Sequence, residues 1–398
     1  MKTKITLLGL TIILVGLFGC EGTAPKELEE YELLDGPLDG LSYEESRRFV
    51  NGDITFNDDV FTVETGLGPI FNGTSCVSCH AGDGKGHPFN AFIRFGQHDE
   101  TGNHYLDQGG PQLQDKAIPG YEPETLPEGA PHATFLAPGV TGLGYFDAVT
   151  DEYLLSIEDP DDANGDGISG RVHWTTIPDY VTPRPDAITQ NGKYINRFGK
   201  KASVYDLLHQ TVFAFNEDMG ITSLYDPYDT YSGDKMSPEV DNETISDMVF
   251  YLKTLKAPIP RDQDDPKVLA GKQTFEAINC AACHRPTMET GYSPIEPLSY
   301  QTFHPYTDLL LHDMGPELDD GYTEGHAKSS EWRTAPLWGL GLSKDSQGGH
   351  YYLMHDGRAQ SIDEAIQLHG GEAENSRNMY NNLSQSEKNE LIRFLESL

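Results

Sequence analysis

The chain has 398 residues and a formal net charge of −35, because 63 acidic residues outnumber 28 basic ones. Its length allows two or three domains that each bury a core, and 41 Gly and 25 Pro favour many loops. The acidity excludes nucleic acid and anionic membrane surfaces as favourable partners, and it favours a basic or neutral protein partner.

Residues 1–19 have the pattern of a bacterial lipoprotein signal peptide, with a short basic start, an apolar run and a processing site before Cys20. Phe18 is bulky for its place in that site, so plain secretion or an uncleaved anchor is the alternative. Each interpretation predicts an exported protein, periplasmic or anchored in the outer membrane by lipid on Cys20. Residues 20–45 are acidic and contain Pro and Gly, which predicts a tether.

Two Cys-x-x-Cys-His strings carry the most specific chemistry in the chain. They are Cys76-Val-Ser-Cys79-His80 and Cys280-Ala-Ala-Cys283-His284. In each string two thiols are spaced to add across the vinyl groups of a haem, and the adjacent His lies beneath the iron as an axial ligand. A zinc site or a thioredoxin-like pair is the alternative, but neither requires a His after the second Cys in both copies. The sequence therefore predicts two covalently attached haem c groups.

The stretch from 81 to 132 is rich in Gly, Pro, Asp and Asn, which predicts long loops after the first string. Its histidines are candidate distal ligands, or candidate proton-transfer groups for peroxide, at the first haem. These are His87, His98, His104 and His132. The alternative is that each is an ordinary surface or turn histidine.

Residues 162–168 match the start of a calcium-binding loop. Asp162, Asn164 and Asp166 stand at positions 1, 3 and 5 and a Gly at position 6, and Ca²⁺ prefers such oxygen ligands. The Glu expected at position 12 is replaced by His173, so Asp159 or another residue would have to complete the shell. The alternative is a turn that is rich in Asp and Asn.

Apolar residues recur with helical spacing in several segments. The helices predicted in this way are 202–219, 243–256, 267–278 and 386–397. Met219 ends the first of them and is either a thioether ligand for the first haem or a core methionine. A break at 258–260 predicts a boundary between an N-terminal haem domain, 46–258, and a C-terminal cytochrome c-like haem domain, 259–398. The predicted fold class is mostly α, with two cytochrome c-like haem domains and long loop insertions.

A short helix is also predicted where Ser361 and Glu364 form a capping box. His369 lies on the apolar face of this helix, and two glycines end it. A His in that place can point into a haem pocket and coordinate the iron opposite His284. The alternative is a core His that is satisfied by a backbone partner.

Several longer strings form a familiar set, at residues 161–171, 218–223, 308–315, 331–341, 355–359 and 364–373. They resemble the bacterial di-haem oxidoreductases that are described as peroxidases or thiol oxidoreductase-like proteins. The wider relatives are the di-haem cytochrome c peroxidases and the di-haem enzyme that matures tryptophan tryptophylquinone. The likeness covers nearly all of the mature chain.

The resemblance implies a two-domain, mostly helical fold in which one haem iron is the peroxide site and the other relays electrons. In relatives the relay haem takes a ligand from the helix after a His-x-Gly turn. That position falls here on His369, with Met314, Met354 and His355 as rivals. A haem with two His ligands would have a lower potential than one with His and Met. The resemblance also implies calcium between the domains, which favours the loop at Asp162.

The chain departs from its relatives at points that bear on activity. The string 132–139 holds no clear counterpart of the peroxidases' distal acid residues, and Lys200 stands where relatives often carry Trp. A Trp relay like that of relatives is therefore absent or rerouted. The tryptophans of this chain are candidate relays or ordinary buried aromatics: Trp174, Trp332 and Trp338.

The sequence therefore predicts an exported di-haem c-type cytochrome that acts as a peroxidase-like oxidoreductase, with one electron-relay haem and one reactive haem. Its expected substrate is peroxide and its expected partner is a small cytochrome or copper protein, while its catalytic side chains stay unassigned. The first alternative is a pure electron-transfer cytochrome in which both haems are six-coordinate. The second is a redox partner for a metal-uptake system.

Overall fold

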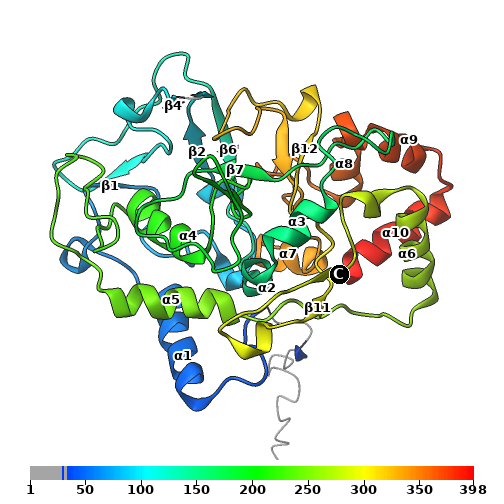
Figure 1. Ribbon diagram of the computed structural model, residues 1–398, viewed down its shortest axis with the longest axis horizontal. Helices are drawn as coiled ribbons and strands as arrows, with labels where there is room; N and C mark the ends of the chain where they lie inside the picture. Colours follow the sequence, from blue (N-terminus) through cyan, green and yellow to red (C-terminus); the bar gives the residue numbers. More distant parts are fainter. Residues whose placement is uncertain (1–28, 31–33, 100) are drawn as a thin grey trace, which may run out of the picture.

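The computed structural model describes residues 29–30, 34–99 and 101–398 (Figure 1). The predicted signal peptide and Cys20 lie outside these residues, as does part of the predicted tether. Among the helices in the described ranges, none combines the length and the apolar character that crossing a membrane requires.

Short helices and short strands are interspersed along the chain. The α-helices of the described part are α1 (Tyr43–Asn57), α2 (Leu143–Ala148), α3 (Asp151–Ile157), α4 (Leu207–Phe213), α5 (Asn242–Thr254), α6 (Pro266–Ala277), α7 (Ser343–Ser346), α8 (Ile362–Gln367), α9 (Glu374–Asn381) and α10 (Gln385–Ser397). The strands there are β1 (Ile70–Phe71), β2 (Phe92–Phe95), β3 (His98–Asp99), β4 (Gly102–Asn103), β5 (Lys116–Ala117), β6 (His132–Phe135), β7 (His173–Thr175), β8 (Thr189–Gln190), β9 (Lys193–Asn196), β10 (Met288–Glu289), β11 (Thr302–Phe303), β12 (Leu311–Asp313) and β13 (Glu331–Arg333).

The strands pair only in small antiparallel ladders within the described residues. Strands β1 and β5, β2 and β6, β3 and β4, β10 and β11, and β12 and β13 pair two by two, and β9 lies between β7 and β8. These ladders join segments of the long loops that the sequence indicates. The expected mostly α fold is therefore correct only in part, because backbone pairing in these ladders, as well as helix packing, orders the chain.

The predicted helices 243–256, 267–278 and 386–397 correspond to α5, α6 and α10. Each begins after a residue whose side chain accepts a hydrogen bond from a first-turn amide: Asp241, Asp265 and Ser384. The predicted helix 202–219 is shorter and changes type, because α4 is followed by a π-helical turn over Ala214–Asp218. Helix α1 was not predicted, although Ser42 and Glu45 form a capping box at its start.

Two helix pairs pack closely enough to require glycine. Helix α1 lies against α5, and α6 lies against α10 (Figure 1). A Cβ atom on Gly52 would come within 2.3 Å of the backbone oxygen of Asp247, and one on Gly271 within 2.0 Å of that of Glu390. Any larger side chain would therefore push these helices apart.

Of the five apolar clusters in the described residues, the two largest form a larger and a smaller core. The larger core joins residues such as Phe146 and Tyr251 to Leu298 and Leu310, which come from beyond the predicted boundary. The smaller core draws only on residues from 268 onward and lies where α6, α8 and α10 meet, at the right of Figure 1. Part of the second half thus packs with the first, and the boundary after residue 258 stays a prediction.

A buried charge network anchors α3. Asp151 is fully buried and accepts hydrogen bonds from Arg184, at 2.7 Å, and from the fully buried Arg197. We expect Asp151→Ala to lower the free energy of unfolding by about 3–5 kcal/mol, because Arg197 would keep a buried charge without its counterion. Equilibrium denaturation measures this loss. Asp186→Ala is the control. The carboxylate of Asp186 also lies near Arg184, at 3.8 Å, but its side chain is 51% exposed. Equal effects of the two substitutions would contradict the prediction.

Candidate functional site

Both Cys-x-x-Cys-His strings line one cavity of about 600 Å³. This volume is within the usual range of ligand and cofactor pockets. The strings reach it from different places, the first after α1 and the second after α6. Their lining residues are Cys76, Cys79 and His80 from the first string, and Cys280, Cys283 and His284 from the second.

The first string has the donor arrangement that a covalent haem requires. Nδ1 of His80 lies 2.8 Å from the carbonyl oxygen of Pro138. Because a carbonyl only accepts, Nδ1 carries the proton and Nε2 keeps a free lone pair. Burial lowers the pKa of His80 to about 4, so the ring is neutral at neutral pH. Burial also raises the pKa of Cys76 to about 12, unlike the lowered pKa of a thioredoxin-type cysteine.

The second string repeats this arrangement. Nδ1 of His284 donates to the carbonyl oxygen of Tyr306 at 3.0 Å, and burial lowers the pKa of His284 to about 4. Burial raises the pKa of Cys280 to about 12. In the described part of the chain, neither string brings both of its thiols together with its own His as a zinc site would require. The residues present therefore fit two thioether-linked haems better than zinc.

His369 lies across from His284. It follows the end of α8, its Nδ1 donates to the carbonyl oxygen of Ala365 at 2.7 Å, and it lines the cavity. The centres of the His369 and His284 rings are 6.4 Å apart. Only half of the predicted capping box is present. The side chain of Ser361 accepts a hydrogen bond from the amide of Glu364. The carboxylate of Glu364 accepts from the amide of Gln360 instead of that of Ser361.

The rival ligands Met314, Met354 and His355 also line the cavity. His355 is already engaged, because its ring stacks on Trp332 with centres 3.7 Å apart and its Nε2 lies 2.5 Å from Asp320. Trp338 lines the cavity as well and stacks on Phe146, whereas Trp174 is not part of the lining.

The four loop histidines do not reach the cavity. His98 bonds to the carbonyl oxygen of Thr323, His104 to the carboxylate of Asp99, and His132 to the carbonyl oxygen of Ala130. His87 stacks on the exposed ring of Phe89. Among the described residues that line the cavity, none of these four is present, which favours the alternative that each is an ordinary surface or turn histidine.

The sequence analysis missed a polar group that lies beside the first string. Asp218 ends the π-helical turn after α4 and lines the cavity. Burial raises its pKa to about 6, and Nε2 of Gln112 donates to its carboxylate at 2.5 Å. The charge of Asp218 raises the pKa values of Cys76 and Cys79, so this carboxylate is close to both thiols. π-Helical turns are frequent at functional sites. The sequence did not reveal this one, because the apolar residues of a π-helical turn are spaced much like those at the end of an ordinary α-helix.

A buried imidazolium lies beside the second string. His312 contacts Asp308 through Nε2 at 2.9 Å and Glu372 through Nδ1 at 2.8 Å. These carboxylates raise the pKa of His312 well above its usual value. Its Nδ1 also lies 3.7 Å from the sulfur of Cys283, and Glu372 accepts a hydrogen bond from the hydroxyl of Ser169 in the first half of the chain. The cluster therefore joins the two halves next to the second string.

The candidate calcium loop is folded around its own backbone. Asp162 accepts from the amide of Gly167 at 3.1 Å, Asn164 from that of Asp166 at 2.8 Å, and Asp166 from that of Ile168 at 2.9 Å. The carboxylates of this loop are not among the groups of His, Cys, Asp and Glu that converge in the described residues. Calcium binding by the loop stays a prediction.

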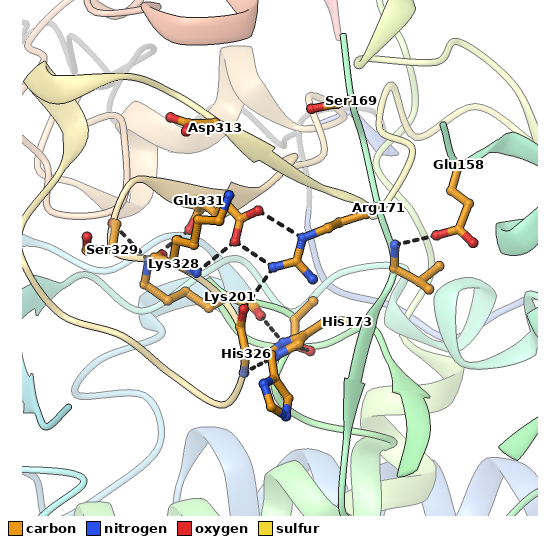
Figure 2. A network of polar contacts seen from close by, with 12 residues as sticks. Glu158, Ser169, Arg171, His173, Lys201, Asp313, His326, Lys328, Ser329 and Glu331 are labelled. Atoms are coloured by element: carbon orange, nitrogen blue, oxygen red, sulfur yellow. Dashed lines mark hydrogen bonds and ion pairs between the residues drawn. The ribbon is translucent and has the colours of Figure 1, made fainter. Parts of the chain in front are cut away.

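A polar network holds β13 against the first half of the chain (Figure 2). Arg171 binds both carboxylate oxygens of Glu331, at 2.8 and 2.6 Å. Nζ of Lys201 donates to the carbonyl oxygens of Lys328, Ser329 and Glu331, at 2.8–3.1 Å. The ammonium of Lys201 also lies 3.8 Å from the ring centre of Trp332. The network thus fixes the strand whose side chains extend into the cavity.

A family model and several solved structures match this chain. A family model described as "di-haem oxidoreductase, putative peroxidase" matches residues 134–398. Similar solved structures include hydrazine synthase from Kuenenia stuttgartiensis (14% identity, 99% of this chain and 100% of that chain, TM-score 0.41). They also include a MauG-like protein associated with microbial copper homeostasis (15% identity, 94% and 95%, TM-score 0.42). No curated protein sequence matches the chain. Because the family model covers more than half of its length, the chain belongs to the di-haem oxidoreductase family.

Proposed function

We propose that the protein is an exported c-type di-haem enzyme that reduces peroxide with electrons from a partner protein. One haem is attached to Cys76 and Cys79 and the other to Cys280 and Cys283. The free Nε2 atoms of the two string histidines and the neutral, buried thiols support this attachment. Haem iron supplies the redox chemistry, and the chain supplies ligands, burial and proton transfer.

The haem at the second string is proposed to be closed and to relay electrons. A metal–imidazole bond is about 2 Å and the radius of an imidazole ring about 1 Å, so rings coordinated on opposite faces have centres roughly 6 Å apart. The centres of His284 and His369 are 6.4 Å apart, and the Nδ1 atoms of both rings donate to carbonyl oxygens. This separation is the observation that carries the proposal. Two His ligands would give this haem a low potential.

The haem at the first string is proposed to keep an open face. Within the described residues, the ring contact of His80 is with Phe56, whose centre is 5.7 Å away and which cannot bind iron. Met219, the candidate from the sequence, packs in the larger core and also lines the cavity, so it is the rival to an open face. An axial position without a protein ligand is the feature that separates a peroxide site from an electron carrier.

Asp218 is proposed to move the proton at this open face. It lines the cavity close to Cys76, and Gln112 holds its carboxylate from the side. A carboxyl whose pKa is about 6 exchanges protons readily near neutral pH. His209 also lines the cavity, but burial lowers its pKa to about 4. We therefore assign proton transfer to Asp218.

Electron paramagnetic resonance of the haem-loaded protein tests the proposed function. We expect one low-spin and one high-spin ferric haem, with the high-spin haem, or its half-reduced counterpart, reacting rapidly with hydrogen peroxide. Two low-spin signals that persist in the half-reduced protein, without peroxide turnover, would instead establish the pure electron carrier.

Calcium binding by the loop at Asp162 is tested by recording the same spectra, and the stability of the protein, after calcium has been removed. Unchanged spectra and stability would rule out a role for this loop.

The electron donor is proposed to be a small cytochrome or copper protein that meets the enzyme outside the cytoplasm. The formal charge of −35 favours a basic or neutral docking face on that donor. Processing before Cys20 would add a lipid that anchors the enzyme to a membrane. This anchor and the export of the chain are proposals from the sequence pattern.

A further inference from the structure

Three half-buried cationic side chains line the cavity without a carboxylate partner. They are Lys85, Lys200 and Arg333. In the part of the chain that the structure describes, neither lysine ammonium makes a hydrogen bond or an ion pair. Arg333 donates only to backbone carbonyl oxygens, those of Gly199 at 2.9 Å and Thr334 at 3.3 Å. Such groups normally recruit an anion when they leave water.

The backbone holds these cations in place at the seam between the two halves. The amide of Arg333 donates to the carbonyl oxygen of Lys200 at 2.9 Å, so their side chains start from neighbouring positions. The hydroxyl of Ser346, from the second half, donates to the carbonyl oxygen of Lys85 at 2.9 Å. The network of Figure 2 fixes β13, which ends at Arg333. The fold therefore fixes the backbone positions from which these three side chains enter the cavity.

The cluster is electrostatically unfavourable as it stands. Burial, with the charges of Lys85 and Arg333, lowers the pKa of Lys200 to about 7. Burial alone lowers the pKa of Lys85 to about 8 and that of Arg333 to about 10. Each shift means that the fold disfavours the positive charge unless an anion is added.

The nearest protein carboxylates are already bound elsewhere. Asp356 attracts Lys200, but its carboxylate bonds to Arg358 at 2.6 Å. Asp308 attracts Arg333, but its carboxylate bonds to His312. A group that occupies the cavity can therefore supply the negative charge that these cations lack.

We propose that Lys85, Lys200 and Arg333 form one shared binding site for the carboxylate side chains of both haems. This inference rests on the proposed function, because it requires haem in the cavity. Lys200 and Arg333 line the same cavity as His80 of the first string and His284 of the second. The cluster thus extends from one haem position toward the other. The forked guanidinium of Arg333 suits a carboxylate, and an ammonium accepts one from any direction.

A shared site has a consequence for electron transfer. Positive charge beside a haem favours its reduction, so the cluster raises the potential of both haems. Carboxylates that share the same cations also make each haem sensitive to the charge of the other. The closed haem and the open haem are therefore coupled through Lys200 and Arg333 as well as through space.

Potentiometric titration of the haem-loaded protein tests the shared site. We expect Lys200→Met and Arg333→Met each to lower the midpoint potentials of both haems and to shift the resonance Raman bands of the haem carboxylates. Lys200→Arg should keep both properties near wild type. Lys267→Met is the matched control, because it removes an exposed lysine from α6. If the first two variants bind haem normally but keep wild-type potentials and Raman bands, the inference is wrong. Lys85→Met gives the same test if either variant fails to fold.

Two further measurements distinguish the shared site from a site for a soluble anion and from failure of the proposed function. Inorganic phosphate added to the wild type should leave the potentials unchanged, because haem carboxylates already occupy the cluster. A phosphate-dependent shift that disappears in Lys200→Met would mean that the cluster binds a soluble anion, which overturns the assignment. Absence of covalent haem from the wild-type protein, measured as the pyridine haemochrome, would instead refute the proposed function itself.

Discussion

Replacing His369 with alanine is expected to convert the haem that we propose at Cys280 and Cys283 from low spin to high spin. In the structure the rings of His369 and His284 lie at the separation that one shared iron requires. Removing the first ring leaves the sixth position to water or to no ligand at all, both of which are weaker than imidazole. The ferric spectrum should then show two high-spin haems, and electron transfer to the first haem should become slow.

Exogenous imidazole should restore the low-spin spectrum of His369→Ala, because it can occupy the space that the ring has left. His369→Met should keep the haem low-spin but raise its potential. The matched controls are Met314→Leu and Met354→Leu, which remove the rival thioethers with little change in volume. If a control changes the spin state and His369→Ala does not, the ligand is a methionine and the relay assignment must be revised.

Local patterns in the sequence carried the predictions that the structure supports. The Cys-x-x-Cys-His strings fix their own geometry, because the two thiols and the His lie within one turn of chain. Helices α5, α6 and α10 also follow from local caps and apolar spacing. The position of His369 at the end of α8 could be predicted for the same reason, because it depends on residues only a few positions away.

Groups that meet only through tertiary packing were not predictable in this way. Lys85, Lys200 and Arg333 come from separate loops and a strand, and no spacing in the sequence marks them as neighbours. Asp308, four residues earlier, raises the pKa of His312, and Glu372, which is distant in sequence, adds to this shift by packing on the ring. The sequence could not decide between the two roles left open for the loop histidines, because the path of a long loop after the first string depends on tertiary packing.

Replacing Asp218 with asparagine is expected to slow the reaction with hydrogen peroxide by about 100-fold or more, the usual size of a general acid–base contribution. The amide keeps the shape of the side chain and can still bond to Gln112, but it cannot take up a proton. Stopped-flow spectroscopy of the half-reduced protein measures the rate. Asp115→Asn is the control, because Asp115 also lines the cavity but is exposed to solvent. Similar rates in both variants would exclude Asp218 as the proton-transfer group.

The pH dependence decides which direction the proton moves at Asp218. Its pKa of about 6 means that the carboxylate is ionised above pH 6 and protonated below it. A base that takes a proton from peroxide must be ionised, so the wild-type rate should fall as the pH drops through 6. An acid would give the opposite slope, with the rate falling as the pH rises. His80 and His209, with pKa values of about 4, cannot produce an inflection at pH 6. Loss of that inflection in Asp218→Asn, with its retention in Asp115→Asn, would assign it to this single carboxylate.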